Sequence, residues 1–243
     1  MTDNSSETFT NNLPYIKGEK SMEWYRRIFG SSVAKKLIMS ITGLFLCSFL
    51  VIHLFGNLFL FWNDGGEMFN KYSEFMSTNI IIRIIEIVLF LGFFFHIVDA
   101  LILSYMNKKT RPIHYKVYKR FETSSLFSRV MFWSGILILL FLVIHLNTFY
   151  ISIRLKGADI TMYDAVVQAF SDPVYSIFYV VSMVFLIFHL NHGFQSGFQT
   201  LGWNNQKYFS FVKGFGTFFA IFISIGFASM PIYFLIRSLS GGN

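Results

Sequence analysis

Charged residues are scarce in this chain of 243 residues: Asp, Glu, Lys and Arg make up only 14% of it, whereas 54% is hydrophobic. A water-soluble domain of this length needs more charge than this to cover its surface. The apolar runs are continuous and lack the alternation typical of a membrane β-barrel. Together these absences leave a polytopic α-helical membrane protein as the expected fold class.

Cysteine is almost absent as well, and the N-terminus has no apolar run. The single cysteine, Cys47, cannot form an internal disulfide. The first 20 residues are polar and show no signal peptide. We therefore expect residues 1–36 to form a cytoplasmic tail whose last part, 21–36, lies at the membrane interface. A solvated basic tail is the alternative for that segment.

Five apolar segments are present, and each is close to the ~20 residues that cross a bilayer. They predict a single domain over residues 37–243, an all-α bundle of five transmembrane helices. The predicted spans cover 37–62, 80–106, 126–150, 174–201 and 212–236.

Basic residues are unevenly divided between the two ends of these spans. Of the 20 Lys and Arg residues, 15 lie in the N-terminal tail, in the loop after the second span, and at the adjoining helix ends. This bias predicts a cytoplasmic N-terminus and an external C-terminus. Because the basic residues flank the apolar runs, the net charge of +7 indicates a lipid bilayer and not a nucleic acid as partner. The other five residues are Lys71, Arg83, Arg154, Lys156 and Arg237.

Four histidines lie well inside four different spans: His53, His96, His145 and His189. Histidine in hydrocarbon is costly and signals a partner. One such residue could simply bond to a backbone carbonyl, but four on four helices indicate a shared role. A further histidine, His192, lies three residues after His189 on roughly the same helix face and competes with it.

The depths of these histidines define two layers. At ~1.5 Å per residue, His53 and His145 lie ~25 and ~27 Å from the cytoplasmic ends of their helices, and His96 and His189 ~16 and ~21 Å. One pair of helices therefore supplies each layer. Without cysteine or carboxylate ligands alongside, iron in haem suits two imidazoles on opposite faces, whereas zinc needs more protein ligands. The sequence thus predicts a bundle that encloses two haems.

Three glycines lie within four residues of these histidines: Gly56, Gly92 and Gly193. Small residues there would let a flat macrocycle approach the backbone. Helix packing is an equally good explanation for them.

Three stretches resemble a known family, the single-chain cytochrome b anchor of succinate dehydrogenases and fumarate reductases, in its type with five helices and two haems. They are SSVAKKLIMSITGLFLCSFLVIHLFGNLFLF (31–61), FFFHIVDALIL (93–103) and FHLNHGFQSGFQTLGWNN (188–205). The resemblance implies a bacterial inner-membrane subunit that holds a flavoprotein and an iron–sulfur subunit on the cytoplasmic face. The dicarboxylate active site would lie on a partner, and electrons would reach quinone, menaquinone being the expected type, through two b haems.

The family's ligand pattern agrees with the two layers. The resemblance pairs helices one and three at the outer haem, through His53 and His145, and helices two and four at the inner haem. Its H-x-x-x-G pattern on the fourth helix falls on His189 and Gly193, which favours His189 over His192. Some fumarate reductases of this type have a glutamate where this chain has Ile187. Its absence puts a transmembrane proton path in doubt and favours succinate oxidation.

A quinone site needs an apolar slot and a group that exchanges protons. Glu74, in the outer loop before the second span, is roughly where the family has a carboxylate, and Glu67 competes with it locally. Both could equally be solvated loop residues. Glu86 is a third candidate, although it could simply pair with Arg83.

Two residues near the cytoplasmic end, Ser40 and Arg129, are candidates to bind the propionates of the inner haem. Ordinary helix-end anchoring explains them equally well. Two other functions remain open at the level of sequence. One is the cytochrome b anchor of another quinone-linked dehydrogenase, and the other is a proton-coupled transporter that uses intramembrane histidines.

Overall fold

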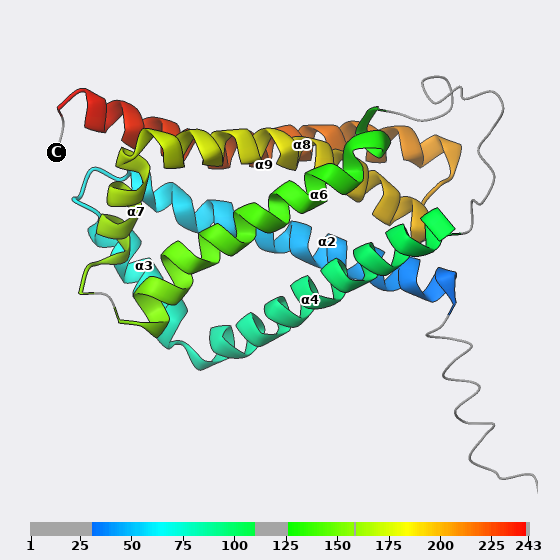
Figure 1. Cartoon of the computed structure of the whole chain (residues 1–243), viewed down its shortest axis with the longest axis horizontal. Helices are drawn as coiled ribbons and strands as arrows, with labels where there is room; N and C mark the ends of the chain where they lie inside the picture. Colours follow the sequence, from blue (N-terminus) through cyan, green and yellow to red (C-terminus); the bar gives the residue numbers. More distant parts are fainter. Residues whose placement is uncertain (1–30, 110–125, 158, 242–243) are drawn as a thin grey trace, which may run out of the picture.

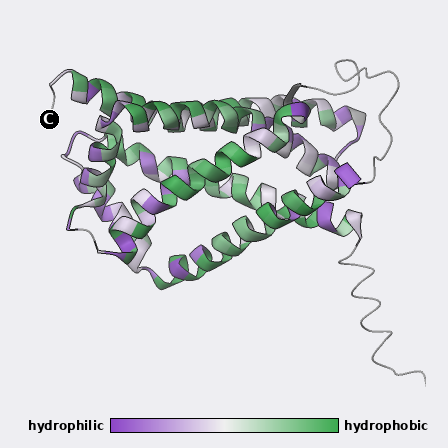
Figure 2. Ribbon diagram, in the orientation of Figure 1, coloured by the Kyte–Doolittle hydropathy of each residue, from purple (hydrophilic) through white to green (hydrophobic). Residues whose placement is uncertain are grey.

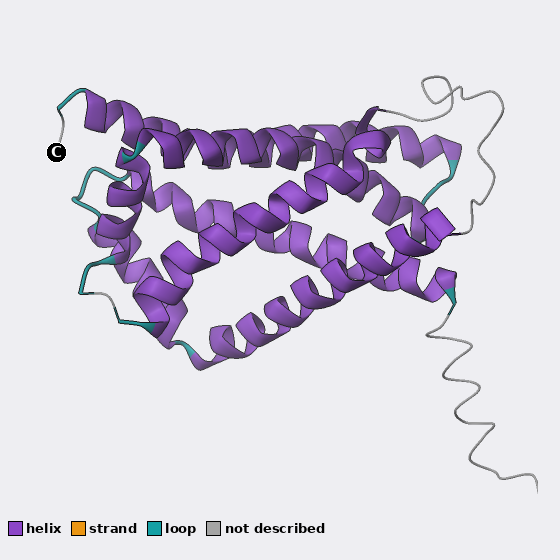
Figure 3. Ribbon diagram, viewed as in Figure 1, coloured by secondary structure: helices purple, strands orange, loops and turns teal. Residues whose placement is uncertain are grey.

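The computed structural model describes residues 31–109, 126–157 and 159–241, and within these ranges all regular structure is helical (Figure 3). Five helices in this part of the chain are long and apolar enough to cross a membrane. The predicted all-α membrane fold with five spans is therefore confirmed. The spans are Ser32–Phe61, Ile80–Lys109, Arg129–Leu155, Pro173–Thr200 and Lys207–Leu239.

Each span is built from one long helix, and two spans end in a segment of different winding. The third span is longer than predicted because a π-helix extends it to Leu155, and the first begins at Ser32, so that Lys35 and Lys36 lie within it. The elements are α2 (Ser32–Asn57) with the 3₁₀ turn η1 (Leu58–Phe61), α4 (Ile80–Lys109), α6 (Leu126–His145) with the π-helix η2 (Leu146–Leu155), α8 (Pro173–Thr200) and α9 (Gln206–Leu239).

Polar side chains at the helix starts explain where several helices begin. Ser31, Asp172 and Asn205 each accept a hydrogen bond from a backbone N–H of the first turn of α2, α8 and α9. Such caps satisfy N–H groups that have no partner within the helix. In α8 the cap is followed by Pro173, whose fixed φ suits the first helical position.

The spans are apolar along most of their length, and polar residues gather toward the two ends of the bundle (Figure 2). Large side chains on α4 and α9 remain exposed, among them Ile80 at 71% and Phe211 at 72%. Exposed apolar side chains along helices of this length face lipid and not water.

Four of the spans form a ring whose neighbours are known from their contacts. α2 packs against α4 and α8, and α6 packs against α8. α9 lies along α8 on the outside of this ring, and Figure 1 shows them as two long antiparallel helices side by side. Within the described residues, α2 has no extensive contact with α6, and α4 has none with α8 or with α6, so the ring is open between α4 and α6. These two pairs are therefore diagonal across the ring.

The two ends of the bundle differ. At one end α2, α6 and α9 begin and α4 and α8 end; we call it the basic end. At the other end two short helices, α3 and α7, cover the bundle (Figure 1), and we call it the capped end. The basic end carries Lys35, Lys36, Lys108, Lys109, Arg129, Lys207 and Lys213.

The expectation that residues between the first two spans form a loop is wrong for α3 (Glu67–Thr78). A second short helix, α7 (Met162–Ser171), precedes α8 and begins at the cap residue Thr161. Both helices are short and partly polar, so hydropathy over a span-length window does not detect them.

Tyr163 joins the parts of the cap. Its backbone N–H donates to Oδ1 of Asn70 in α3 at 3.0 Å, and its hydroxyl accepts from Arg237 of α9 at 3.2 Å. Its ring packs over Gly66, which has a φ of +89° and where a Cβ would lie 2.2 Å from the ring. The ring also meets Phe234 edge to face at 6.0 Å between centroids. The cap is thus a packed unit fixed to α9.

Candidate functional site

The structure brings together the histidines that the depth argument pairs. The ring centroids of His53 in α2 and His145 in α6 are 5.8 Å apart, at an interplanar angle of 89°. Those of His96 in α4 and His189 in α8 are 6.4 Å apart, at 70°. Each pair therefore joins two diagonal helices of the ring.

The two pairs lie at different levels along the bundle. His96 packs on Gly43 of α2, where a Cβ would lie 3.1 Å from its Cε1, and His189 packs on Gly135 of α6, where it would lie 3.5 Å away. Gly43 is ten residues before His53, and Gly135 is ten residues before His145. Both helices thus separate the two levels by about 15 Å. The His96–His189 pair is nearer the basic end.

Hydroxyl groups on neighbouring helices occupy Nδ1 of the basic-end pair. The hydroxyl of Thr42 donates to the carbonyl of Ile38 at 2.8 Å and lies 3.3 Å from Nδ1 of His96. With its hydrogen on this carbonyl, the hydroxyl is placed to accept from the ring N–H. Ser134 repeats the arrangement: it donates to the carbonyl of Met131 at 2.9 Å and lies 3.5 Å from Nδ1 of His189. Both imidazoles are thus left with an unprotonated Nε2.

A chain of hydroxyl groups also contacts Nδ1 of His145. Nδ1 of His145 is 3.2 Å from the hydroxyl of Tyr179, which is 2.8 Å from that of Tyr175. Tyr175 donates to Thr148 at 3.0 Å. The hydrogen of Tyr175 is therefore used, so Tyr179 donates to Tyr175 and accepts from Nδ1 of His145. Nε2 of this ring is free as well.

Aromatic side chains hold the fourth ring. His53 stacks on Phe49 of its own helix at 5.2 Å and lies 5.5 Å from the ring of Phe227 in α9. These contacts fix the plane of the His53 ring without using a ring nitrogen.

This donor set fits haem iron. Metal–imidazole bonds of about 2 Å on both sides of an ion place two ring centroids about 6 Å apart, as in both pairs. In the described part of the chain no three His, Cys, Asp or Glu side chains converge on one point. An ion between either pair therefore takes its other ligands from elsewhere, as the iron of a haem does from its macrocycle. All four histidines also remain half-buried, so neighbouring side chains do not close over them.

The glycines singled out in the sequence have mostly a packing role. A Cβ on Gly56 would lie 2.4 Å from the ring of Tyr72, and one on Gly92 would lie 3.1 Å from Phe45. Gly193 lies near Met131 and not beside either histidine pair. The two glycines in contact with histidine rings, Gly43 and Gly135, precede the paired histidine on their own helix by ten residues. No sequence spacing links either glycine to the ring that packs on it.

The other candidate residues at the basic end are placed as follows. The ring opposite His96 belongs to His189, and His192 lies one turn further toward the basic end. The buried Ser40 donates its hydroxyl hydrogen to the carbonyl of Lys36 at 2.8 Å, within its own helix. Arg129 is half-buried at the start of the third span. Propionate contacts remain a prediction for both.

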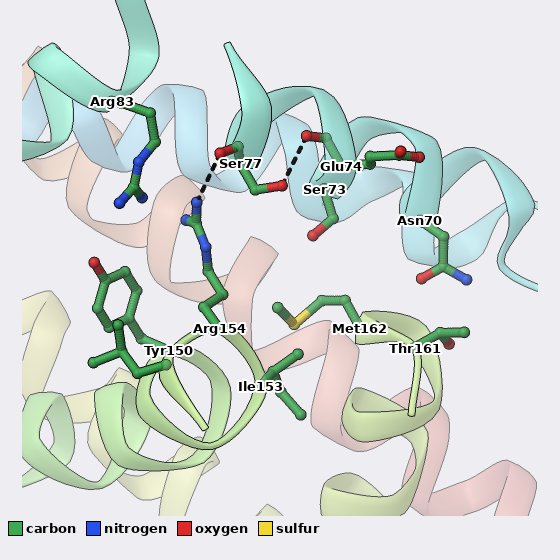
Figure 4. Close-up of a pocket in the computed structure, with 11 residues that line it drawn as sticks. Asn70, Ser73, Glu74, Ser77, Arg83, Tyr150, Ile153, Arg154, Thr161 and Met162 are labelled. Atoms are coloured by element: carbon green, nitrogen blue, oxygen red, sulfur yellow. Dashed lines mark hydrogen bonds between the residues drawn. The ribbon is translucent and has the colours of Figure 1, made fainter. Parts of the chain in front are cut away.

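A cavity of about 540 Å³ opens at the capped end, between α3, the start of α4, η2 and the start of α7 (Figure 4). It is an open pocket, and its volume lies within the range of small-molecule sites. In Figure 4 the side chain of Arg154 rises from η2 toward α3, with Tyr150 and Arg83 on one side of it. The lining residues are Asn70, Ser73, Glu74, Ser77, Arg83, Tyr150, Ile153, Arg154, Leu155, Thr161 and Met162.

The three glutamates proposed for a quinone site differ in their relation to this cavity. Glu74 lines it. Glu67 faces away and pairs with Lys71 at 2.5 Å; this hydrogen bond and the charge of Glu67 raise the pKa of Lys71. Both of these side chains are 67% exposed, so the solvated alternative describes Glu67.

Glu86 lies behind the cavity wall, where three side chains hold it. Arg83 donates to it at 2.6 Å, as the sequence spacing suggested, and the hydroxyl of Tyr150 donates to it at 2.5 Å. Arg154 approaches it at 3.4 Å. Tyr150 and Arg154 were missed in the sequence because only the π winding of η2 determines which way they face.

The fold and the histidine geometry define a class: multi-pass helical membrane proteins with two facing pairs of intramembrane histidines. Residues 106–228, half of the chain, match the model of the succinate dehydrogenase/fumarate reductase transmembrane subunit family. The chain belongs to this family. A search of curated proteins and a search of solved structures gave no match. Of the four paired histidines, His145 and His189 lie in the matched range, and His53 and His96 precede it.

Proposed function

We propose that this chain is the cytochrome b anchor of a succinate:quinone oxidoreductase and holds two b haems, one between His53 and His145 and the other between His96 and His189. The observation that carries the proposal is the pair of facing histidine rings at each of two levels. A haem at each level would supply one-electron redox chemistry within the membrane.

The chain's own residues prepare these sites. Thr42, Ser134 and Tyr179 select the ring tautomer with a free Nε2, and such hydrogen bonds at the other ring nitrogen orient metal-binding histidines in general. Gly43 and Gly135 leave room for His96 and His189 against the neighbouring helix. His189 is the proposed ligand and His192 its alternative, while Ser40 and Arg129 are proposed contacts for the propionates.

The cavity at the capped end is the proposed quinone site. It has room for a quinone ring. One of its walls is formed by η2, the element that directly follows His145. Glu74, which lines it, is the proposed group for proton exchange with water, since quinone reduction takes up two protons with two electrons. Glu86 contributes from behind the wall, and Glu67 has no part in the site.

The proposed partners bind at the basic end. These partners, a succinate-oxidising flavoprotein and an iron–sulfur subunit, would lie on the cytoplasmic face of a bacterial inner membrane. The bias of Lys and Arg indicates that the basic end faces this side. The family match supports this assignment over an anchor for another quinone-linked dehydrogenase. A transporter with histidine relays would need ionisable rings along a continuous path, whereas these rings form two separate pairs.

The decisive experiment is a haem-to-protein ratio with a reduced-minus-oxidised spectrum on the purified complex. We expect two b haems per chain together with a flavin and an iron–sulfur subunit. A ratio near one would refute the pairing, and a colourless protein would favour the transporter. Co-purification of other redox subunits would indicate a different dehydrogenase.

A further inference from the structure

The wall of the cavity contains a polar group whose members come from two elements. Tyr150 and Arg154 belong to η2, and Glu86 and Arg83 to α4. Glu86 is 15% exposed and Arg154 23%, so both are largely withdrawn from solvent at the membrane's edge. Charged groups at such a position are costly unless they serve a site.

Two of these residues face the cavity with hydrogen-bonding capacity to spare. Within the described residues, Arg154 makes two long hydrogen bonds, 3.4 Å to Glu86 and 3.4 Å to the carbonyl of Ser77, although a guanidinium has five N–H donors. The hydroxyl of Tyr150 donates to Glu86, and its oxygen lies beside the Arg83 guanidinium, with a second lone pair that can accept from a ligand. The Arg154 guanidinium lies 5.5 Å from the centre of the Tyr150 ring, and both side chains contact the same carboxylate, that of Glu86.

The π winding of η2 turns Tyr150 and Arg154 toward the cavity. The N–H of Lys156 donates to the carbonyl of Ile151, five residues earlier, at 3.0 Å. In an α-helix Tyr150 would be rotated by about 140° from His145. In a π-helix the hydrogen bonds span five residues and each turn is wider than in an α-helix, so Tyr150 and Arg154 follow His145 by roughly one and two turns.

We propose that Tyr150 and Arg154 bind one oxygen of the quinone ring and that Glu86, acting through Tyr150, accepts and returns its proton. This inference rests on the proposed function and deepens it. Arg154 donates a hydrogen bond to the oxygen and stabilises the negative charge that develops there. Tyr150 is the proton-exchanging group in contact with the ring, and Glu86 is a positioning residue behind it.

The proton and electron balance is as follows for quinol oxidation. A quinol O–H bond breaks and its proton joins the Tyr150 oxygen, while the original Tyr150 proton passes to the Glu86 carboxylate and then to water. The second proton leaves from the other oxygen on the Glu74 side. Two electrons leave the ring and reduce fumarate through the partner subunits. In succinate oxidation the same bonds form and break in reverse, so the quinone gains two electrons and two protons.

The test uses the purified complex and two assays: succinate oxidation with a short-chain naphthoquinone, and succinate oxidation with a soluble dye that bypasses this chain. We expect Tyr150→Phe to lower kcat for the quinone at least 10-fold with little change in KM, because proton transfer and not binding is impaired. Glu86→Gln should alter the same limb of the pH profile, and the double variant should be no slower than either single one. The dye assay should be unchanged in all of them.

Arg154→Gln should raise KM for the quinone at least 10-fold, and Arg154→Lys should recover part of the loss because it keeps the charge. Tyr233→Phe removes a hydroxyl from α9 outside the cavity and is the matched control, expected to match the wild type. Wild-type kcat and pH profile in Tyr150→Phe, or wild-type KM in Arg154→Gln, overturns the inference.

Ser73→Trp, which fills the cavity, separates this inference from the proposed quinone site. If Ser73→Trp abolishes the quinone assay while the Tyr150 and Arg154 variants are silent, the cavity is the quinone site and the inference is wrong. If Ser73→Trp leaves the quinone assay intact, the quinone binds elsewhere and both ideas fail together.

Discussion

The hydroxyl of Thr42 acts on His96 through a single hydrogen bond. Its own hydrogen is bound to the carbonyl of Ile38, so the oxygen accepts from Nδ1–H and the lone pair of Nε2 points elsewhere. Tyr179 has the same effect on His145 by a longer route through Tyr175. At the scale of single residues, neutral hydroxyls and not carboxylates thus choose the ring nitrogen that can bind a metal.

A threonine-to-valine exchange tests this control. Thr42→Val has nearly the same shape but cannot accept a hydrogen bond, so His96 loses its hydroxyl partner and keeps only its backbone partner, Met39. We expect the affinity for one of the two haems to fall about 10-fold or more, as for other groups that orient metal ligands. Haem titration of the apo complex measures it. Thr42→Ser keeps the hydroxyl and should bind like the wild type; equal binding by Thr42→Val would contradict the tautomer assignment.

Leucine replacements of the four histidines test the pairing itself. His53→Leu and His145→Leu should remove one and the same spectral component, and His96→Leu and His189→Leu the other. A reduced-minus-oxidised spectrum at low temperature resolves the two components. The His192→Leu variant is the control and should keep both if His189 is the ligand. Loss of the same component in the His53 and His96 variants would show that the pairs are wrong.

At the scale of elements, the sequence predicted what depends on composition and missed what depends on contacts. The five spans follow from continuous apolar runs, and the two histidine levels follow from position along each run. The approach of Gly43 to His96 depends on how α2 and α4 cross, which no run of residues encodes. The direction of Tyr150 depends on the π winding of η2, and its hydroxyl is fixed by Glu86 on another helix.

Two adjacent glycines allow the cap to be tested with a built-in control. Gly65 and Gly66 both have positive φ, but a Cβ would meet Tyr163 only at Gly66, and would meet nothing within 4 Å at Gly65. Gly65→Ala should therefore lower the free energy of unfolding by about 1 kcal/mol through backbone strain alone. Gly66→Ala should lower it by a further 1–3 kcal/mol, roughly, because the Tyr163 ring must move.

Thermal unfolding followed by tryptophan fluorescence measures this difference, and limited proteolysis shows whether α7 detaches from α3. Equal melting temperatures for the two variants would mean that Tyr163 yields without loss, and that the cap is less tightly packed than its contacts indicate.

At the scale of the whole molecule, the two ends are suited to different neighbours. The capped end is covered by the short helices α3 and α7. Tyr163 joins these two helices to each other and to α9. The basic end carries the lysines at the ends of α2, α4 and α9, and the bundle presents its helix termini there. Among the described residues, no short helix covers the ends of the spans at the basic end.

Orientation in the membrane follows from the same charges. We expect a reporter fused after Asn243 to be active on the outer face, and one inserted in the 108–120 loop to be active on the inner face. Alkaline phosphatase and green fluorescent protein fusions report the two sides. The reverse pattern would place the proposed partner subunits at the capped end and would exchange the inner and outer levels.

The two histidine levels are ten residues apart along α2 and along α6. A voltage across the membrane acts over this distance. About 15 Å is half of the ~30 Å hydrocarbon core of a bilayer. A single charge that moves from the level of His96 to that of His53 thus crosses about half of the membrane voltage, or roughly 1 kcal/mol per 100 mV. Residue 187, two positions before His189, is an isoleucine and has no proton to exchange. Its side chain therefore cannot move a proton that would compensate the movement of this charge. The distribution of electrons between the two levels should therefore shift with an imposed voltage in sealed vesicles.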